Sequence, residues 1–162
     1  MLTRHASSIR AELAALREAA GCDFAALAWK DSNGYAVRWR FASGETNDRY
    51  TRIVLQPGQG IAGTVLRTER PYLVNTLELR SGEDPRQYAI MLAEQLQSAA
   101  GHPVTAGGAV RGVALLGFRE SNRRIEEPEL AALRDAAARI GAAIDGAAID
   151  GAASGDRRRI AP

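Results

Sequence analysis

Residues 38–74 read RWRFASGETNDRYTRIVLQPGQGIAGTVLRTERPYLV and contain the pattern that decides the fold. The stretch begins with the alternation of apolar and polar residues that is typical of a strand. Residues 57–69 are a glycine-rich turn that runs into a short helix. Arg70-Pro71 ends this helix, because the residue before a proline disfavours helical backbone. PYLVN (71–75) then predicts a second short strand.

The residues on the N-terminal side of this stretch predict a helix and a hairpin. Residues 8–20 carry apolar side chains at helical spacing, and Gly21 ends the pattern. Residues 23–30 are typical of a buried strand, and DSNG at 31–34 favours a tight turn. The next strand, residues 35–42, alternates and so predicts a sheet with one wet face. One face of that strand is expected to hold Tyr35, Val37, Trp39 and Phe41.

The residues on the C-terminal side predict a loop, a short helix and two strands. Residues 76–87 are polar and irregular. Residues 88–96 favour a turn of helix with Glu94 facing outward. Residues 98–105 and 111–119 predict two strands joined by a turn with the sequence AGG.

A long helix is predicted at the end of the chain. It begins at Glu126, spans about five turns and keeps apolar residues on one side as far as Ile144. From about Gly146 we expect a fraying helix end and then a disordered tail. The sequence therefore predicts a single domain at residues 1–146 and a flexible C-terminal tail at residues 147–162. Helices at both ends with strands between them indicate an α+β fold with an antiparallel sheet.

The composition is that of one globular domain. The chain has 162 residues, of which 46% are hydrophobic and 25% are charged, and these values are ordinary for a folded protein. No apolar run approaches the about 18 residues that a membrane helix needs. Glu12 interrupts the first apolar stretch, which argues against a secretory signal. We therefore expect a cytoplasmic protein that makes no contact with a membrane.

Charge and reactive side chains exclude several classes of protein. The formal net charge is +2, and the arginines are scattered rather than arranged in a basic stripe with aromatics, so nucleic acid is not expected as a partner. A lone Cys22 cannot form an internal disulfide or a CxxC pair. His5 and His102 are the only imidazoles. We expect no metal site, no cofactor and no catalytic residue, and therefore no enzymatic activity.

The glycine loop Gly58–Thr64, GQGIAGT, is the best candidate for a site. Glycines let a backbone approach a ligand closely, and the first N–H groups of a helix have no acceptor inside the helix. Such a helix start attracts an anion or a carbonyl oxygen. The same glycines could instead make only a tight turn and close packing. The loop is not the phosphate loop GxxxxGK[ST], and no lysine follows it, which disfavours a nucleotide phosphate.

The quoted stretch resembles GAF domains. The family pattern is a strand, an aromatic-bearing loop, G-x-G-[IL]-A-G at the start of a helix, and R-P-Y at the entry to the next strand. GVALLGF at residues 112–118 is similar to the family's following strand. The resemblance covers residues 8–145. It implies a central antiparallel sheet with the N- and C-terminal helices packed on one face, and a ligand-sensing role.

Within the family, the chain looks most like the nitrate-binding members. The likeness rests on RW before the glycine loop, GIAG within it, and Tyr-x-Ile followed by E-x-L after it. In those members backbone N–H groups at the helix start hold the anion against a Trp wall. The resemblance implies N–H donors at Ile61 and Ala62, a wall at Trp39, and closure by Tyr88 and Ile90. The implied ligand-binding residues are Trp39, Gly60, Ile61, Ala62, Tyr88 and Ile90.

The resemblance also implies an output partner, a sensor histidine kinase. The apolar sides of residues 8–20 and 127–145 are expected to be only partly covered by the sheet, so that these helices dock a kinase or form a homodimer. Two alternatives stay open: a GAF domain that binds a cyclic nucleotide, and a GAF domain that serves only as a dimerisation scaffold. Pocket size distinguishes them, since a small closed cavity favours nitrate, a larger open cleft favours a nucleotide and no cavity favours a scaffold.

Overall fold

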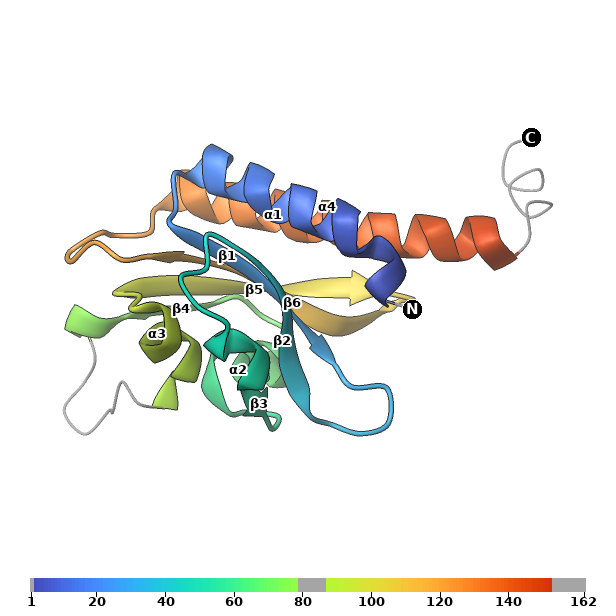
Figure 1. The fold of residues 1–162 in the computed structure, drawn as a ribbon, viewed down its shortest axis with the longest axis horizontal. Helices are drawn as coiled ribbons and strands as arrows, with labels where there is room; N and C mark the ends of the chain where they lie inside the picture. The colour runs from blue at the N-terminus through green and yellow to red at the C-terminus, as the bar shows by residue number, and fades with distance from the viewer. Residues whose placement is uncertain (1, 79–86, 153–162) are drawn as a thin grey trace.

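A computed structural model describes residues 2–78 and 87–152 of the chain. Its centre is one six-stranded sheet in the order β3-β2-β1-β6-β5-β4, in which every neighbouring pair is antiparallel. Two long helices cover one face of this sheet, and two short helices lie on the other (Figure 1). In chain order the elements are η1 (Leu2–His5), α1 (Ala6–Ala20), β1 (Phe24–Lys30), β2 (Val37–Ser43), η2 (Arg49–Arg52), β3 (Val54–Leu55), α2 (Gly60–Thr68), β4 (Tyr72–Asn75), η3 (Thr76–Glu78), α3 (Ala89–Glu94), β5 (Ser98–Ala106), β6 (Ala109–Phe118) and α4 (Glu127–Ala152).

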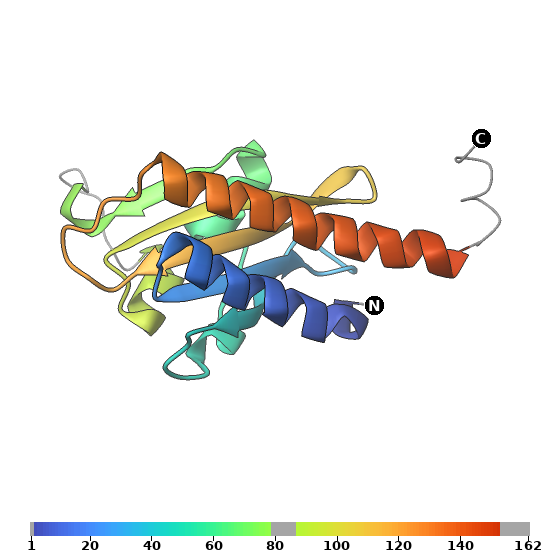
Figure 2. The same cartoon turned by 90° about the horizontal axis from the view of Figure 1, so that it is seen from above.

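The terminal helices α1 and α4 lie side by side on one face of the sheet (Figure 2). Their apolar residues recur every three or four positions, so each helix turns one side toward the strands. The first core between these helices and the sheet includes Ile9, Leu13, Leu16, Leu133, Ile140 and Ile144. This arrangement confirms the predicted α+β class, a central antiparallel sheet with the N- and C-terminal helices packed on one face.

The large apolar side chains described for α1 and α4 are buried against the sheet, except for the half-buried Leu130. In the part of the chain whose side chains are described, the large apolar residues that stay exposed lie on other elements: Tyr35, Val54, Leu73, Leu77 and Leu92. The two helices meet through a polar pair as well, since Arg139 Nε donates to Glu12 Oε1 at 2.7 Å. The apolar margin that remains exposed on these helices consists of small residues, among them Ala11, Ala14, Ala15, Ala138 and Ala142, and its use in docking stays a prediction.

Helix α4 also extends further than predicted. It continues to Ala152, whereas the sequence favoured a fraying end from about Gly146. The flexibility of residues 147–162 stays a prediction, and residues 153–162 lie outside the described part of the chain. Among the helices that the structure describes, none combines the length and the apolar character needed to cross a membrane.

A β-bulge changes which side chains of β2 face the site. Leu27 pairs with Phe41 and Ala28 pairs with Trp39, so Arg40 is an extra residue without a partner on β1. Trp39 therefore faces the short helices, while Phe41 joins the first core beneath α1. Tyr35 lies before the strand and is 71% exposed. The expectation that one face of the strand holds Tyr35, Val37, Trp39 and Phe41 is therefore wrong for Tyr35 and Phe41, and it holds for Val37 and Trp39.

The second core lies on the opposite face of the sheet, under α2 and α3. Trp39 is the largest fully buried side chain among the described residues, and it belongs to this core together with Phe24, Ile61 and Leu115. Glu94 ends α3 and is 0% exposed, so the expectation that it faces outward is wrong. Its carboxylate is turned inward because it pairs with Arg119 at 2.6 Å. This core positions the candidate site.

Candidate ligand-binding site

The start of α2 is shaped by glycines. Gly58 and Gly60 have φ angles of 83° and 65°, a region that side chains with a Cβ disfavour. A Cβ on Gly60 would lie 3.3 Å from the Leu55 side chain. A Cβ on Gly63 would collide with the carbonyl oxygen of Gln56. The glycines thus serve the turn and its packing, and they also bring bare backbone to the surface of the site.

The first turn of α2 presents backbone donors without helical acceptors. Gln59 is the N-cap and makes no side-chain cap hydrogen bond. The first main-chain bond of the helix is from Gly63 N to Gln59 O, at 3.1 Å. The N–H groups of residues 60–62 precede that bond, and they carry the positive end of the helix dipole. Ile61 and Ala62 are 1% and 0% exposed, so their N–H groups are shielded from water, and a hydrogen bond is stronger in such a low-dielectric environment.

Trp39 adds a side-chain donor to the same core. Its indole is 1% exposed, and its Nε1 has no hydrogen-bond partner among the described residues. An indole N–H can only donate, and a buried donor without an acceptor is unfavourable. Trp39 shares its core with Ile61, Ala62, Tyr88 and Ile90. The region therefore offers donors and apolar surface, which is the chemistry that suits a weakly hydrated anion.

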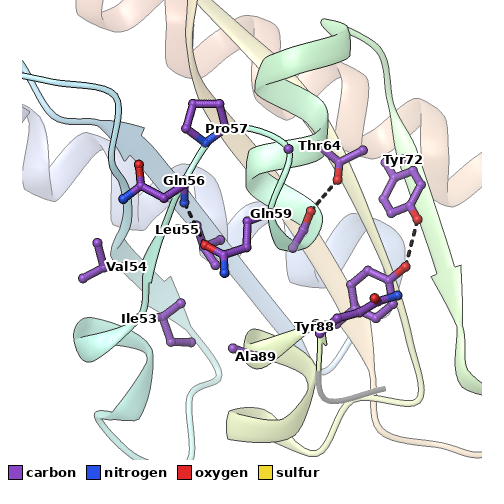
Figure 3. Close-up of a pocket in the computed structure, with 13 residues that line it drawn as sticks. Ile53, Val54, Leu55, Gln56, Pro57, Gln59, Thr64, Tyr72, Tyr88 and Ala89 are labelled. Carbon is purple, nitrogen blue, oxygen red and sulfur yellow. Dashed lines mark hydrogen bonds between the residues drawn. The ribbon is translucent and has the colours of Figure 1, made fainter. Parts of the chain in front are cut away.

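A pocket opens beside the start of α2 (Figure 3). Its volume is about 740 Å³, within the range of about 300–1,000 Å³ that is usual for small-molecule sites. Several lining residues are exposed, so the pocket reaches the protein surface. It is lined by residues 53–60 and by Thr64, Tyr72, Gln87, Tyr88 and Ala89, none of which carries a charged side chain.

The predicted site residues fall into two groups. Gly60 and Tyr88 line the pocket. Trp39, Ile61, Ala62 and Ile90 are buried in the adjoining core. The structure thus brings all six to the same face of the sheet, and their contact with a ligand stays a prediction. The pocket is larger than the small closed cavity that would favour nitrate alone.

Several lining residues were missed by the sequence reasoning. The hydroxyl groups of Tyr72 and Tyr88 lie 2.9 Å apart, and this pair joins β4 to the start of α3 (Figure 3). Thr64 Oγ1 donates to Gly60 O at 2.6 Å, and Gln56 N donates to Gln59 Oε1 at 2.9 Å. Tyr72 stands in the R-P-Y motif, which could have pointed to it. Amide and hydroxyl side chains gave no comparable signal.

The remaining candidate reactive groups lie away from this pocket. Cys22 belongs to the first core, on the other face of the sheet. Burial raises the pKa of its thiol from 9.0 to about 11, which keeps it protonated and poorly nucleophilic at neutral pH. His102 is half-buried, and its Nδ1 lies 2.9 Å from the carbonyl oxygen of Pro103. Neither residue is placed for chemistry on a ligand in the pocket.

Three examples illustrate the solved structures to which this chain is similar. An NreA protein from Staphylococcus aureus, mutated in its nitrate binding site, is 31% identical with a TM-score of 0.69; the match covers 78% of this chain and 96% of that chain. The GAF domain of a phosphoenolpyruvate-protein phosphotransferase from Coxiella burnetii is 21% identical with a TM-score of 0.71, over 91% and 86% of the two chains. A domain assigned to a two-component sensor histidine kinase from Sinorhizobium meliloti 1021 is 19% identical with a TM-score of 0.70, over 90% and 94%.

The family comparison agrees with this architecture. No curated protein matches the chain. The model of the GAF domain matches residues 7–144, which include the sheet, the glycine loop and most of both terminal helices. The two structures at about 20% identity share the fold, and the NreA protein adds a likeness in sequence. The chain therefore belongs to the GAF domain family.

Proposed function

We propose that this GAF domain binds nitrate at the start of α2. The observation that carries the proposal is the buried Trp39 Nε1, a donor without a protein acceptor among the described residues, in the same core as Ile61 and Ala62. The likeness to an NreA protein described with a nitrate binding site supports the same ligand. In this proposal the amides of Ile61 and Ala62 and the Trp39 indole donate to the anion, while Tyr88 and Ile90 close the site.

The physical chemistry of nitrate fits such a site. Nitrate is a weakly hydrated monoanion, so it loses less hydration free energy on burial than phosphate does. Oriented amide dipoles can then hold the anion without a buried cation. The absence of charged side chains among the described pocket-lining residues is compatible with this mode. We expect a dissociation constant between micromolar and millimolar, about −8 to −4 kcal/mol.

Output through a sensor histidine kinase is part of the same proposal. The resemblance to nitrate-sensing GAF proteins implies this partner, and the docking surface in this proposal is the pair of helices α1 and α4, which lie side by side on one face of the sheet (Figure 2). Most of their large apolar side chains are buried, so docking would use the outer faces of the helices, where charged side chains and alanines are exposed. A homodimer through the same layer is the competing use of this surface.

The pocket volume favours a second candidate ligand. A pocket of about 740 Å³ that reaches the surface has room for a cyclic nucleotide, whose phosphate could accept hydrogen bonds from the same amides. The two candidates differ in their need for Trp39. A nucleotide in the outer pocket does not require the indole N–H, because Trp39 does not line that pocket.

Isothermal titration of the purified protein tests both candidates. The titrants are nitrate, nitrite, chloride, iodide and cyclic nucleotides, each against the natural sequence and the Trp39→Phe variant. We expect saturable heat with nitrate in the natural protein and much weaker binding in the variant. A flat nitrate titration beside clear binding of a cyclic nucleotide would refute the proposal and establish the alternative.

A further inference from the structure

Helix α3 connects the pocket to a buried polar cluster. Its N-terminal end, at Tyr88 and Ala89, lines the pocket. Its C-terminal residue, Glu94, is 0% exposed and pairs with Arg119 at 2.6 Å. The helix has only six residues, and main-chain bonds from Leu92 N to Tyr88 O at 3.3 Å and from Leu96 N to Met91 O at 2.8 Å tie its start to the segment that carries Glu94. We therefore expect a displacement of Tyr88 or Ile90 to move Glu94 as well.

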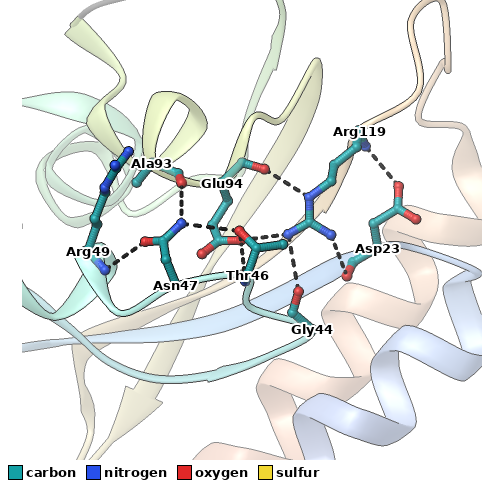
Figure 4. A network of polar contacts seen from close by, with 8 residues as sticks. All are labelled: Asp23, Gly44, Thr46, Asn47, Arg49, Ala93, Glu94 and Arg119. Carbon is teal, nitrogen blue, oxygen red and sulfur yellow. Dashed lines mark hydrogen bonds and ion pairs between the residues drawn. The ribbon is translucent and has the colours of Figure 1, made fainter.

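Arg119 joins three segments through one guanidinium group (Figure 4). Its Nε donates to Glu94 O at 2.9 Å and its Nη2 donates to Glu94 Oε1 at 2.6 Å. Nη2 also donates to Gly44 O at 3.1 Å, in the loop that follows β2. Nη1 lies 3.5 Å from the carbonyl oxygen of Asp23. The planar fork of an arginine allows these bonds at one time, whereas an ammonium group has no such geometry.

The same residue lies at the junctions with the terminal helices. Asp23 follows the C-cap of α1 at Gly21, and its carboxylate accepts the backbone N–H of Arg119 at 2.8 Å. Asp23 N donates to Gly117 O at 3.0 Å. Arg119 itself directly follows β6, at the beginning of the loop that leads to α4. The cluster therefore ties α3 to the end of α1 and to the approach of α4.

The carboxylate of Glu94 is held from a second side. The backbone N and the Oγ1 of Thr46 both donate to Glu94 Oε1 at 3.0 Å. Asn47 Nδ2 donates to Ala93 O at 2.9 Å. Glu94 Oε2 has no partner among the described residues. A buried charge with one satisfied and one unsatisfied oxygen is sensitive to small shifts, because it can lose or gain a bond on moving slightly.

We propose that Arg119 is a positioning residue that couples occupancy of the ligand site to the terminal helices α1 and α4. The inference rests on the proposed function for its ligand, but its structural basis is the chain of contacts from Tyr88 through Glu94 and Arg119 to Asp23. Closure of α3 on a ligand moves Glu94, and the fork of Arg119 passes that movement to the α1–β1 junction and to the β6–α4 connection. The ligand changes the helices only by its differential affinity for the two arrangements.

Hydrogen exchange measured with and without nitrate tests the coupling. The variant is Arg119→Lys, which keeps a charge beside Glu94 and removes the fork. Glu94→Gln, which keeps the shape of the side chain and removes the ion pair, is the second variant. Arg38→Lys is the matched control, because Arg38 pairs with Asp31 at 3.1 Å outside the cluster. The measured quantity is the change in hydrogen exchange that nitrate causes. The readout is this change in the terminal helices, at residues 9–20 and 127–140, divided by the change at the pocket segments, residues 58–65 and 88–94. Each protein is measured at the same fractional saturation with nitrate.

The expected result is a ligand-dependent change in both terminal helices of the natural protein. Each cluster variant should keep the change at the pocket and reduce the helix-to-pocket ratio at least threefold. Arg38→Lys should keep the natural ratio. A purely structural role of Arg119 would alter overall exchange and leave this ratio unchanged. The inference is overturned by a natural ratio in both cluster variants, or by pocket protection in the natural protein without a change in α1 and α4.

A ligand-free arm separates this inference from the nitrate proposal. Ile90→Val shortens a buried side chain of α3 that is 2% exposed, and so perturbs the site without any ligand. Exchange at residues 9–20 and 127–140 should respond to Ile90→Val in the natural background and not in the Arg119→Lys background. If nitrate fails to bind, the nitrate proposal falls and this arm alone decides the inference. Equal responses in both backgrounds, or none in either, would overturn it.

Discussion

Replacing Trp39 by phenylalanine removes one hydrogen-bond donor from the candidate site while keeping an aromatic ring in place. Trp39 is 1% exposed and its Nε1 has no protein acceptor among the described residues. A hydrogen bond to a charged group contributes about 1.5–3 kcal/mol. At about 1.4 kcal/mol per tenfold change in affinity, the variant should bind nitrate about 10- to 150-fold more weakly.

The stability of the ligand-free protein should change much less. The smaller phenyl ring of the Trp39→Phe variant would leave a small cavity, which costs on the order of 1–3 kcal/mol. The substitution also removes a buried unpaired donor, which recovers about 1–3 kcal/mol of desolvation cost. The two effects are of similar size and opposite sign. Without nitrate, the melting temperature of the variant should therefore be close to that of the natural protein.

Thermal melts with nitrate turn this difference into a measurement. At about 100 times the natural dissociation constant, nitrate should stabilise the natural protein by about 2.7 kcal/mol and the variant by about 0.3–1.4 kcal/mol. Trp29→Phe is the matched control, because Trp29 packs against the first core on the other face of the sheet. Nitrate should stabilise this variant as much as it stabilises the natural protein. Equal stabilisation of Trp39→Phe and the natural protein would refute the role of the indole as a ligand donor.

Three further predictions concern the loop, the buried ion pair and the thiol. Gly60→Val should abolish nitrate binding in titration, because Gly60 has a φ of 65°, which a valine rarely adopts. The Ile61→Leu variant should bind nitrate with the affinity of the natural protein. Full nitrate affinity in a folded Gly60→Val protein would exclude this loop as the site. Arg119→Ala should lower the free energy of unfolding in urea by about 3–5 kcal/mol because it removes the cation that pairs with the buried Glu94 carboxylate. Arg38→Ala, at an exposed pair, should cost under about 1 kcal/mol, and equal losses would contradict the buried role. Burial raises the pKa of Cys22 from 9.0 to about 11, so the unfolded chain ionises first and the fold should lose about 2–3 kcal/mol between pH 9 and pH 11. Cys22→Ala should remove that part of the pH dependence, and an unchanged pH profile in the variant would show that Cys22 is not its source.

Sequence periodicity predicted the elements better than it predicted the faces of β2 and α3. Helical spacing and Gly21 located α1 within two residues of its observed start, because local patterns encode helix ends. The bulge at Arg40 depends on the register with β1, which no local pattern contains, and so Phe41 was placed on the wrong face. Glu94 was expected to face solvent as charged residues usually do. Its partner Arg119 lies 25 residues further along the chain, and only the folded sheet brings the two together.

The candidate site was predictable where its residues carry a motif. The glycine loop, Trp39 and the Tyr88–Ile90 pair were proposed because a family pattern marks them, and the structure places them on one face of the sheet, while their contact with a ligand stays a prediction. The pocket wall at residues 53–57 could not be found in the same way. Its members are aliphatic or amide side chains and a proline, and they form a wall only because β3 pairs with β2 at the edge of the sheet.

The extra residue in β2 has a consequence for how this chain is aligned with its relatives. Arg40 has no partner on β1, so deleting it would leave Trp39 and the residue that is now Phe41 adjacent, on opposite faces of an unbulged strand. Each side chain would still pack in the layer it occupies now, because neighbouring residues of a regular strand alternate between faces. Relatives that are one residue shorter here are therefore expected to keep the same core. An alignment gap belongs at position 40, and one placed elsewhere in the strand would compare residues from different layers.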